Sequence, residues 1–290
     1  HQAYFMRGDR FDGSAFDPPY AFAVPRLGVN WRAARGLDVF AAYAHSRREP
    51  AFRDLYDAEG AGSLPLYGTI DVPNGVFEDP LVRPERVNDW ELGARWRSAA
   101  SADGEPSLSL SANLFRMDFE DELVYAGQFN TDLGYPTIGN AARSVHQGVE
   151  LGGRWARLSG HGLRVTADAN LSLSDNHFDE YREVYGTASG DTVRYDGNTI
   201  GFFPNTTANL ALRGEWRGSS LGIAVQHAGR IFVDNTATDA NSIEPRTVVD
   251  LSLAQRFARR DGSWVECSLR LGNLFDERYE AGGYMDYDAT

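Results

Sequence analysis

The chain has 290 residues, with 41 acidic and 28 basic side chains and a formal net charge of −13. This acidic balance argues against a nucleic-acid partner. Mean hydropathy is −0.42 and no run of about 18 apolar residues occurs, so membrane-spanning helices are excluded. The single cysteine, Cys267, cannot form an internal disulfide and is expected to be a small apolar strand residue.

Ten stretches of the chain alternate apolar and polar residues, a pattern that predicts strands with one apolar and one wet face. The expected strands lie at about 22–32, 37–46, 86–97, 107–119, 143–157, 162–174, 205–216, 220–230, 246–257 and 263–273. In the sixth strand Val165, Ala167 and Leu171 share one side, whereas Arg164 and Asp168 share the other. Charged side chains on the second side fit a water-filled lumen better than a packed soluble core.

The connections between these strands differ in length. Short ones lie near 33–36, 98–106, 158–161, 217–219 and 258–262. Long ones span about 47–85, 120–142, 175–204, 231–245 and 274–290. In outer-membrane barrels the short turns face the periplasm and the long loops face outside. We therefore expect the first strand to descend and the tenth to ascend, so that the chain would end in an extracellular loop without a closing strand.

Tryptophans gather beside the short connections. Five of the six are placed there: Trp31, Trp96, Trp155, Trp216 and Trp264. At a membrane interface the half-polar indole ring is favoured, so we expect these residues to form a periplasmic aromatic girdle. A soluble β-sandwich or propeller is the alternative, but it explains neither the lumenal charges nor the tryptophans at one level. The chain is therefore predicted to be all-β, an antiparallel transmembrane β-barrel or part of one.

Four short motifs occur in order along the chain, and each has ordinary structural roles. They lie at residues 42–56 (AYAHSRREPAFRDLY), 81–93 (LVRPERVNDWELG), 145–151 (VHQGVEL) and 272–279 (GNLFDERY). Their structural residues are Pro50, Leu55, Tyr56, Pro84, Glu85, Glu91, Leu92, Gly93, Gly148, Glu150, Asn273, Leu274, Phe275, Asp276 and Tyr279. Pro84 suits the start of a strand, Gly148 permits close backbone approach, and Asn273 and Asp276 can end a strand in a turn. Glu150 should point to the lumen.

In this order and spacing, the four motifs resemble the C-terminal half of a TonB-dependent outer-membrane receptor, over about residues 37–284. The resemblance implies a barrel of about 22 strands around an N-terminal plug. Residues 1–290 would then be a partial barrel domain that holds roughly strands 12 to 21, with the plug and the closing strand outside it. Such receptors lie in the outer membrane of Gram-negative bacteria.

The resemblance also implies a function. Receptors of this family import a scarce nutrient, usually a ferric siderophore and sometimes cobalamin, haem, copper or a carbohydrate, with energy from the TonB complex pulling on the plug. The partners would be membrane lipid, lipopolysaccharide, the TonB complex and a small-molecule or metal-chelate ligand. A passive porin-like or structural barrel without a plug is the alternative. Long loops, which can close over a ligand, favour the receptor.

Candidate ligand contacts lie in the long loops. The cations that could bind an anionic chelate through charge-assisted hydrogen bonds are Arg47, Arg48, Arg53, Arg182 and Arg194. The aromatic residues that could line the mouth of the barrel include Tyr135, Tyr181 and Phe202. Plain solvated loops, an outer aromatic girdle and contacts with lipopolysaccharide phosphate are the alternatives for these residues.

No catalytic site, cofactor or metal site is predicted. Asp175, His177 and Asp179 lie close in sequence, but their spacing matches no loop of fixed coordination geometry. The six histidines form no H-x-x-x-H pair, and no phosphate-cradling glycine loop or nucleophile elbow occurs. An enzymatic function is therefore not expected.

Overall fold

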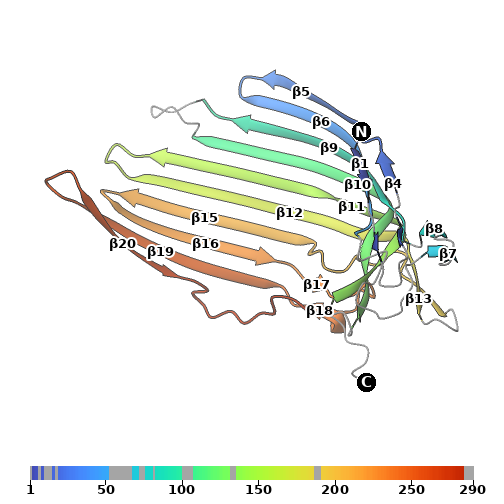
Figure 1. The fold of residues 1–290 in the computed structure, drawn as a ribbon. Coiled ribbons are helices and arrows are strands. Elements are labelled where there is room, and N and C mark those ends of the chain that lie inside the picture. Colours follow the sequence, from blue (N-terminus) through green and yellow to red (C-terminus); the bar gives the residue numbers. More distant parts are fainter. Residues whose placement is uncertain are drawn as a thin grey trace.

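The dominant feature of the molecule is one curved antiparallel sheet of ten strands (Figure 1). The computed structural model describes residues 2–5, 8–9, 15–16, 19–51, 67–71, 76–80, 82–99, 107–130, 135–185 and 191–283. The sheet contains, in order, β5 (Arg26–Ala34), β6 (Leu37–Arg48), β9 (Glu85–Arg97), β10 (Leu108–Asn130), β11 (Tyr135–Leu158), β12 (Arg164–Glu180), β15 (Thr206–Trp216), β16 (Ser219–Ala228), β19 (Arg246–Ala258) and β20 (Trp264–Leu271). Consecutive strands of this sheet pair with each other, and β5 and β20 form its two edges, so the sheet is a simple meander.

Five small hairpins gather at the end of the sheet where the long connections lie, on the right of Figure 1. They pair β1 (Gln2–Phe5) with β4 (Pro19–Phe22), β2 (Gly8–Asp9) with β3 (Ala15–Phe16), β7 (Tyr67–Asp71) with β8 (Val76–Pro80), β13 (Arg182–Tyr185) with β14 (Asp191–Arg194), and β17 (Ile231–Phe232) with β18 (Ser242–Ile243). A single 3-10 turn (Asp239–Asn241) is the only helical element in the described ranges. Within those ranges no helix has the length and hydrophobicity needed to cross a membrane.

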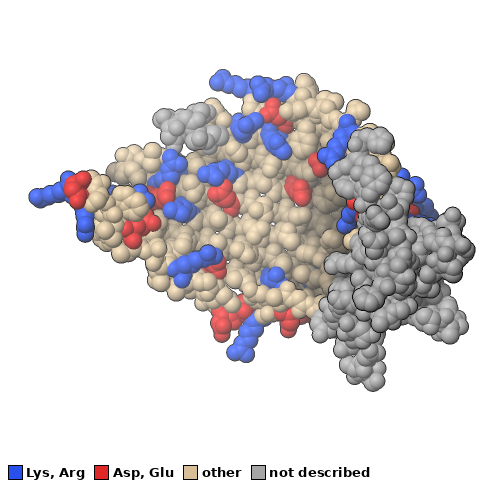
Figure 2. Space-filling model, in the orientation of Figure 1, with Lys and Arg blue, Asp and Glu red and all other residues tan. Residues whose placement is uncertain are grey.

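The two faces of the sheet have opposite chemistry because directly paired residues share a face. Leu114, Val149 and Leu173 form one cross-strand row on the apolar face. The neighbouring row on the polar face joins Asn113, Glu150 and Ser172. Ion pairs cross the polar face, among them Arg97–Asp38 at 2.8 Å, Arg154–Asp168 at 3.3 Å and Arg270–Asp250 at 2.9 Å. Figure 2 shows Arg and acidic side chains lying in scattered pairs over one face of the sheet.

The tryptophans beside the short turns lie along a line that is inclined to the direction of the hydrogen bonds between strands. Following paired residues from Trp31 across six strand steps leads to Ala208 in β15, eight residues before Trp216. At about 3.4 Å per residue and about 4.8 Å per strand, this displacement gives a strand tilt of about 40°. Strands of membrane barrels tilt by about 35–45° relative to the barrel axis, so a ring of tryptophans at constant height requires such a displacement.

Trp264 does not share the face of Trp31, Trp96, Trp155 and Trp216, which corrects its expected place in a common girdle. In β20 it alternates with Val265 and Cys267, which lie on the apolar face, so it lies on the same face as Glu266 and Arg270. The Arg256 guanidinium, on the polar face, lies 4.5 Å from the Trp264 ring centroid. Strand alternation therefore turns this indole to the polar side.

All ten predicted strands are present within a few residues of their expected ends, but three extend further than the sequence suggested. Residues 120–142, expected as a loop, are mostly strand, because β10 and β11 keep pairing out to Asn130 and Tyr135. Likewise β12 continues to Glu180 through pairs such as Gln147–Asp175. Cross-strand hydrogen bonds continue beyond the point where apolar–polar alternation stops, so the local pattern underestimates the length of these strands.

Candidate functional site

Five polar side chains are buried together where β9 to β12 run into the long connections. This loop-end polar cluster consists of Glu85, Glu122, Ser144, His146 and Asn176, all less than one-tenth exposed. Glu85 opens β9, Glu122 lies in β10, Ser144 and His146 lie in β11, and Asn176 lies in β12. Four neighbouring strands therefore each contribute a polar group to one small volume.

His146 is held between two oxygen acceptors. Its Nε2 lies 3.0 Å from Oε1 of Glu122, and its Nδ1 lies 2.9 Å from Oδ1 of Asn176. Two oxygen partners require a proton on both ring nitrogens, which is the imidazolium form. Burial alone would lower the pKa of His146, but hydrogen bonds and negative charge from Glu122, with Asn176 and Glu85, outweigh it and raise this pKa above its ordinary value. The Ser144 hydroxyl donates to the other oxygen of Glu122.

Glu85 supplies the second carboxylate of the cluster. Its Oε2 accepts hydrogen bonds from the Arg48 guanidinium at 2.8 Å and from the Leu123 backbone N–H at 3.0 Å. Burial raises the pKa of Glu85 above its usual range, the Leu123 and Arg48 contacts lower it, and the nearby Glu122 charge raises it further. With Arg48 and an imidazolium at His146, the two carboxylates are balanced by two cations, as buried charges require.

Aromatic rings flank the histidine. The Phe119 and Phe203 ring centroids lie 5.1 Å and 5.2 Å from that of His146, both in edge-on geometry. Phe203 is 45% exposed, so one of these rings also forms part of the molecular surface. The site therefore combines a buried, charge-balanced network with an exposed aromatic ring directly above its histidine.

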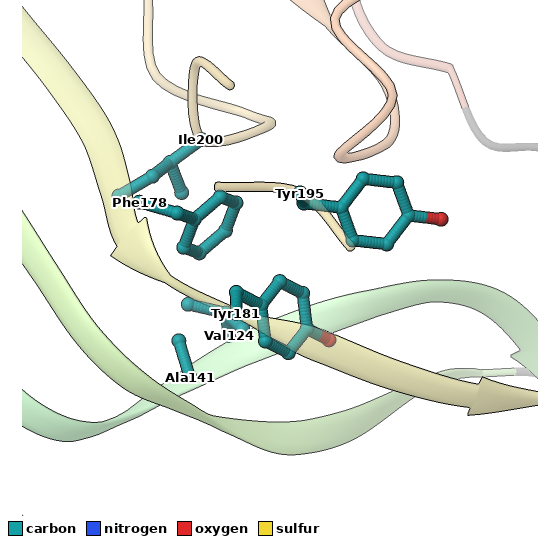
Figure 3. Packing of buried hydrophobic residues seen from close by; sticks show 6 residues of the cluster. All are labelled: Val124, Ala141, Phe178, Tyr181, Tyr195 and Ile200. Atoms are coloured by element: carbon teal, nitrogen blue, oxygen red, sulfur yellow. The ribbon is translucent and has the colours of Figure 1, made fainter. Parts of the chain in front are cut away.

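A hydrophobic core fixes the loops beside this cluster. It consists of Val124, Ala141, Phe178, Tyr181, Tyr195 and Ile200, and Figure 3 shows the three aromatic rings close together, inclined to one another. The ring centroids of Phe178 and Tyr181 are 4.7 Å apart, and those of Tyr181 and Tyr195 are 5.6 Å apart. The Ile200 N–H donates to the Asn176 carbonyl at 3.0 Å, which ties the loop before β15 directly to the cluster.

The predicted ligand contacts do not converge on one site. Arg48 belongs to the network through Glu85, but Arg47 lies on the other face, with its guanidinium 4.9 Å from the Phe22 ring centroid. Tyr181 is only 2% exposed, because its ring is part of the loop core; this corrects its proposed place at an open mouth.

The remaining predicted contacts are scattered among the loops. Arg182 is exposed, and Arg194 pairs with Asp196. Phe202 is half-buried, with a positive φ of 68° and its N–H bonded to the Phe232 carbonyl at 2.8 Å. Tyr135 begins β11, but its side chain, like the whole of Arg53, lies outside the described residues.

The residues of the second and third sequence motifs lie in the wall of the sheet. Pro84 immediately precedes β9, and Glu85 belongs to the polar cluster. A Cβ at Gly93 would overlap the Phe40 ring, and one at Gly148 would overlap the Leu173 carbonyl oxygen. Three further members of these motifs are placed by the strand registers: Leu92 on the apolar face, and Glu91 and Glu150 on the polar face.

The first and last motifs are only partly described. Pro50 is fully buried, and Leu55 and Tyr56 lie outside the described residues. Asn273 bonds Glu277 twice at 2.9 Å and, like Asp276, has a positive φ, so the chain turns directly after β20. Leu274 and Phe275 are exposed, and the Tyr279 ring lies 4.8 Å from the Arg246 guanidinium.

The acidic residues around His177 do not form a recognisable metal site. His177 lies 3.2 Å from Asp175 and 3.5 Å from Asp179, as an ordinary histidine between two carboxylates. Among the residues that the structure describes, no group of three or more His, Cys, Asp or Glu side chains could hold a metal ion.

An antiparallel meander with one apolar face, one ion-paired face and tryptophans at an inclined level is the wall of a membrane β-barrel. The model of the family described as "TonB dependent receptor-like, beta-barrel" matches residues 6–274. The chain therefore belongs to the TonB-dependent receptor β-barrel family.

Individual relatives agree with this family. The pesticin receptor of Yersinia enterocolitica (serotype O:8 / biotype 1B) is 27% identical over 238 residues, which cover 80% of this chain and 30% of the relative. The chain thus spans about a third of the length of the curated relatives it matches. The ferric yersiniabactin uptake receptor FyuA from Yersinia pestis has the same fold, with a TM-score of 0.65, 18% identity and coverage of 98% and 37% of the two chains. The copper transporter OprC matches with a TM-score of 0.60, 17% identity and coverage of 92% and 36%.

Proposed function

We propose that the chain is part of an outer-membrane receptor that imports a ferric siderophore with energy from the TonB complex. The observation that carries this proposal is the family match over residues 6–274, which includes all ten strands of the sheet. Uptake by such receptors needs a plug inside the barrel and contact of that plug with TonB. Both partners are therefore part of the proposal, as is location in the outer membrane of a Gram-negative bacterium.

The proposed membrane placement follows from the two faces. The apolar face would contact lipid, and the ion-paired face would line the lumen, where charged groups remain hydrated. The apolar stretch of β12 runs from Val165 to Leu173 and ends at Asp175. About nine to eleven tilted residues are enough for a strand to cross the hydrocarbon core, so the length of this stretch is suitable. The short turns would face the periplasm and the loop-end polar cluster would face outward.

Support for a metal chelate as the ligand comes from chemistry at the loop end. The exposed Phe203 ring and the 58% exposed Arg48 side chain both adjoin the polar cluster. An aromatic ring and a guanidinium can together contact a flat, anionic chelate by stacking and charge-assisted hydrogen bonds. Among the relatives, FyuA is described as a ferric yersiniabactin receptor and OprC as a copper transporter.

The test is metal uptake by the intact protein in a bacterial strain that lacks other ferric siderophore receptors. We expect uptake of radioactive iron supplied as a ferric siderophore, and we expect it to stop when TonB is deleted. Uptake that continues without TonB would identify a passive barrel instead. Copper accumulation without iron uptake would retain the energy-coupled receptor and replace its ligand.

A further inference from the structure

A hollow opens in the apolar face of the sheet, close to the short turns that connect β15 with β16 and β19 with β20. Its volume is about 570 Å³. It is lined by residues that include Leu163, Gly214, Trp216, Leu221, Leu253 and Leu269. Gly214 pairs directly with Val165 on one side and Leu221 on the other, so a glycine interrupts a row of large apolar side chains. A Cβ at Gly214 would meet nothing within 4 Å, which locates the open space at this residue.

The guanidinium of Arg217 lies at the edge of the hollow. The Trp216 indole lines it and donates through Nε1 to the His161 carbonyl at 3.3 Å, which fixes the ring. The Arg217 guanidinium lies 4.7 Å from the centroid of that ring. Stacking on an indole holds a guanidinium in place without neutralising its charge. Among the described residues, no carboxylate lies within ion-pair distance of Arg217.

The turn itself does not account for an arginine at this position. Trp216 pairs with Ser219, so Arg217 and Gly218 form a two-residue hairpin loop, with φ of 49° and 85°. Such a type I′ loop favours asparagine, aspartate or glycine, because both residues must adopt positive φ. Arg217 therefore occupies a backbone conformation that few side chains favour, so the turn geometry by itself does not select an arginine here.

The surrounding charge has the same sign. The turn that connects β19 with β20 also carries Arg259 and Arg260, and Arg157, near the end of β11, pairs with Val165. Two acidic side chains near the hollow in sequence are already ion-paired: Glu215 with Arg213 at 3.0 Å and Glu266 with Arg256 at 3.0 Å. Asp261 keeps its negative charge, so the turn after β19 has two arginines against one carboxylate. The apolar hollow is thus bordered by excess positive charge on its turn side.

We propose that this hollow binds one anionic phospholipid of the periplasmic leaflet, with acyl chains against Gly214 and the phosphate on Arg217. The inference rests on the membrane placement proposed above and adds a ligand that is separate from the transported one. The apolar hollow matches the acyl chains, the tryptophan matches the interfacial region, and the unpaired cation matches the phosphate. These features follow one another in the same order as the parts of a phospholipid, from the hydrocarbon core to the membrane surface. A second copy of the chain fits less well, because a symmetric contact would bring two Arg217 edges together.

The experiment is native mass spectrometry of the intact protein, released from detergent in the presence of phosphatidylglycerol or phosphatidylcholine. We expect one retained phosphatidylglycerol. Arg217→Asn keeps a residue that the type I′ loop favours, so the fold should be maintained while affinity for phosphatidylglycerol falls about fivefold or more. Gly214→Leu fills the hollow and should weaken binding of both lipids. The matched controls are Arg35→Asn in another short turn and Gly153→Leu elsewhere on the apolar face, and neither should change lipid binding.

Equal lipid retention by all variants would overturn the proposal. So would dimers that form a disulfide through Cys267, which also lines the hollow, if they appear in oxidised membranes and disappear in Cys267→Ser. Failure of the underlying membrane placement gives a different result, since the protein would then be absent from the outer-membrane fraction. A correctly inserted protein with unselective lipid binding would refute the lipid site alone.

Discussion

His146 and Glu122 form a buried pair in which Nε2 and Oε1 lie 3.0 Å apart, with both residues less than one-tenth exposed. The pair joins β10 to β11 beyond the apolar stretch of the sheet. Through Asn176 it also reaches the backbone of the loop before β15. A change at either residue should therefore affect both local stability and loop order.

Removal of the histidine should be costly. His146→Leu leaves Glu122 buried near Glu85 without its cation, and loss of one partner of a buried pair costs about 3–5 kcal/mol. Equilibrium urea unfolding of the intact protein measures this change. The double variant His146→Leu/Glu122→Leu should recover most of the lost stability, because replacement of both charges by apolar groups is often neutral. A double variant as unstable as the single one would contradict the pairing.

The same pair should make loop order depend on pH. The folded-state pKa of His146 is raised, so its stabilising contribution is complete below its unfolded pKa of about 6.5 and is lost as pH rises through the folded pKa. Hydrogen exchange of the Ile200 amide, which bonds Asn176, should therefore become faster than the intrinsic pH effect predicts as pH rises above about 6.5 and through the raised folded-state pKa of His146. The excess should vanish in His146→Leu. An equal excess in that variant would assign the effect to other groups.

Gly148 should tolerate no side chain. A Cβ there would overlap the Leu173 carbonyl oxygen and lie 2.9 Å from the Cα of Ser174, both in the backbone of β12. Gly148→Ala should therefore destabilise the sheet by about 1–3 kcal/mol. Gly160→Ala is the control, because a Cβ at Gly160 meets nothing within 4 Å. Thermal unfolding of the two variants compares them directly, and equal melting temperatures would refute the close approach of β11 and β12.

The assignment of the two faces can be tested with adjacent arginines. Leu171 lies on the apolar face and Ser172, paired with Glu150, lies on the polar face. Leu171→Arg should cost about 2–4 kcal/mol in a membrane, as charges near the midplane of a barrel do. Ser172→Arg should be nearly neutral, since Glu150 is its cross-strand neighbour. Folding titrations in lipid vesicles provide the measurement, and the reverse order of stability would invert the proposed membrane orientation.

The exposed ring above His146 should contribute to ligand binding if the proposed function is correct. Phe203→Ala should lower affinity for the transported ferric siderophore about three- to tenfold, in line with an aromatic contact of about 0.5–1.5 kcal/mol. Phe203→Trp keeps an aromatic ring and should retain most of the affinity. Fluorescence titration with the purified intact receptor measures both. Unchanged affinity in Phe203→Ala would place the ligand elsewhere.

Much of the sheet could be predicted from the sequence because a barrel wall repeats a period of two. Leu163, Val165 and Ala167 alternate with Arg164 and Thr166, and this alternation alone assigns the faces of β12. The same rule, applied strictly, would have placed Trp264 with Glu266. The prediction instead followed its position next to a short turn. The structure shows that the alternation of residues along the strand decides the face.

Most of the candidate site could not be predicted from this alternation of residues. Glu85 stood in a motif, but Glu122 and His146 are 24 residues apart and meet only when the register of β10 and β11 is known. Tyr181 looked like a loop aromatic because nothing in its local sequence reveals that Phe178 and Tyr195 cover it. The useful sequence signal was a histidine on the polar side of a strand, between Ser144 and Gly148.

Each strand of the sheet pairs only with its neighbours along the chain. An insertion or deletion in a long connection therefore changes no register within the wall, because the two strands it joins are already adjacent. Loops on such a scaffold can diverge rapidly while the strands stay constant. In the proposed membrane placement, the meander would allow the loops to change without any change in the strands that cross the membrane.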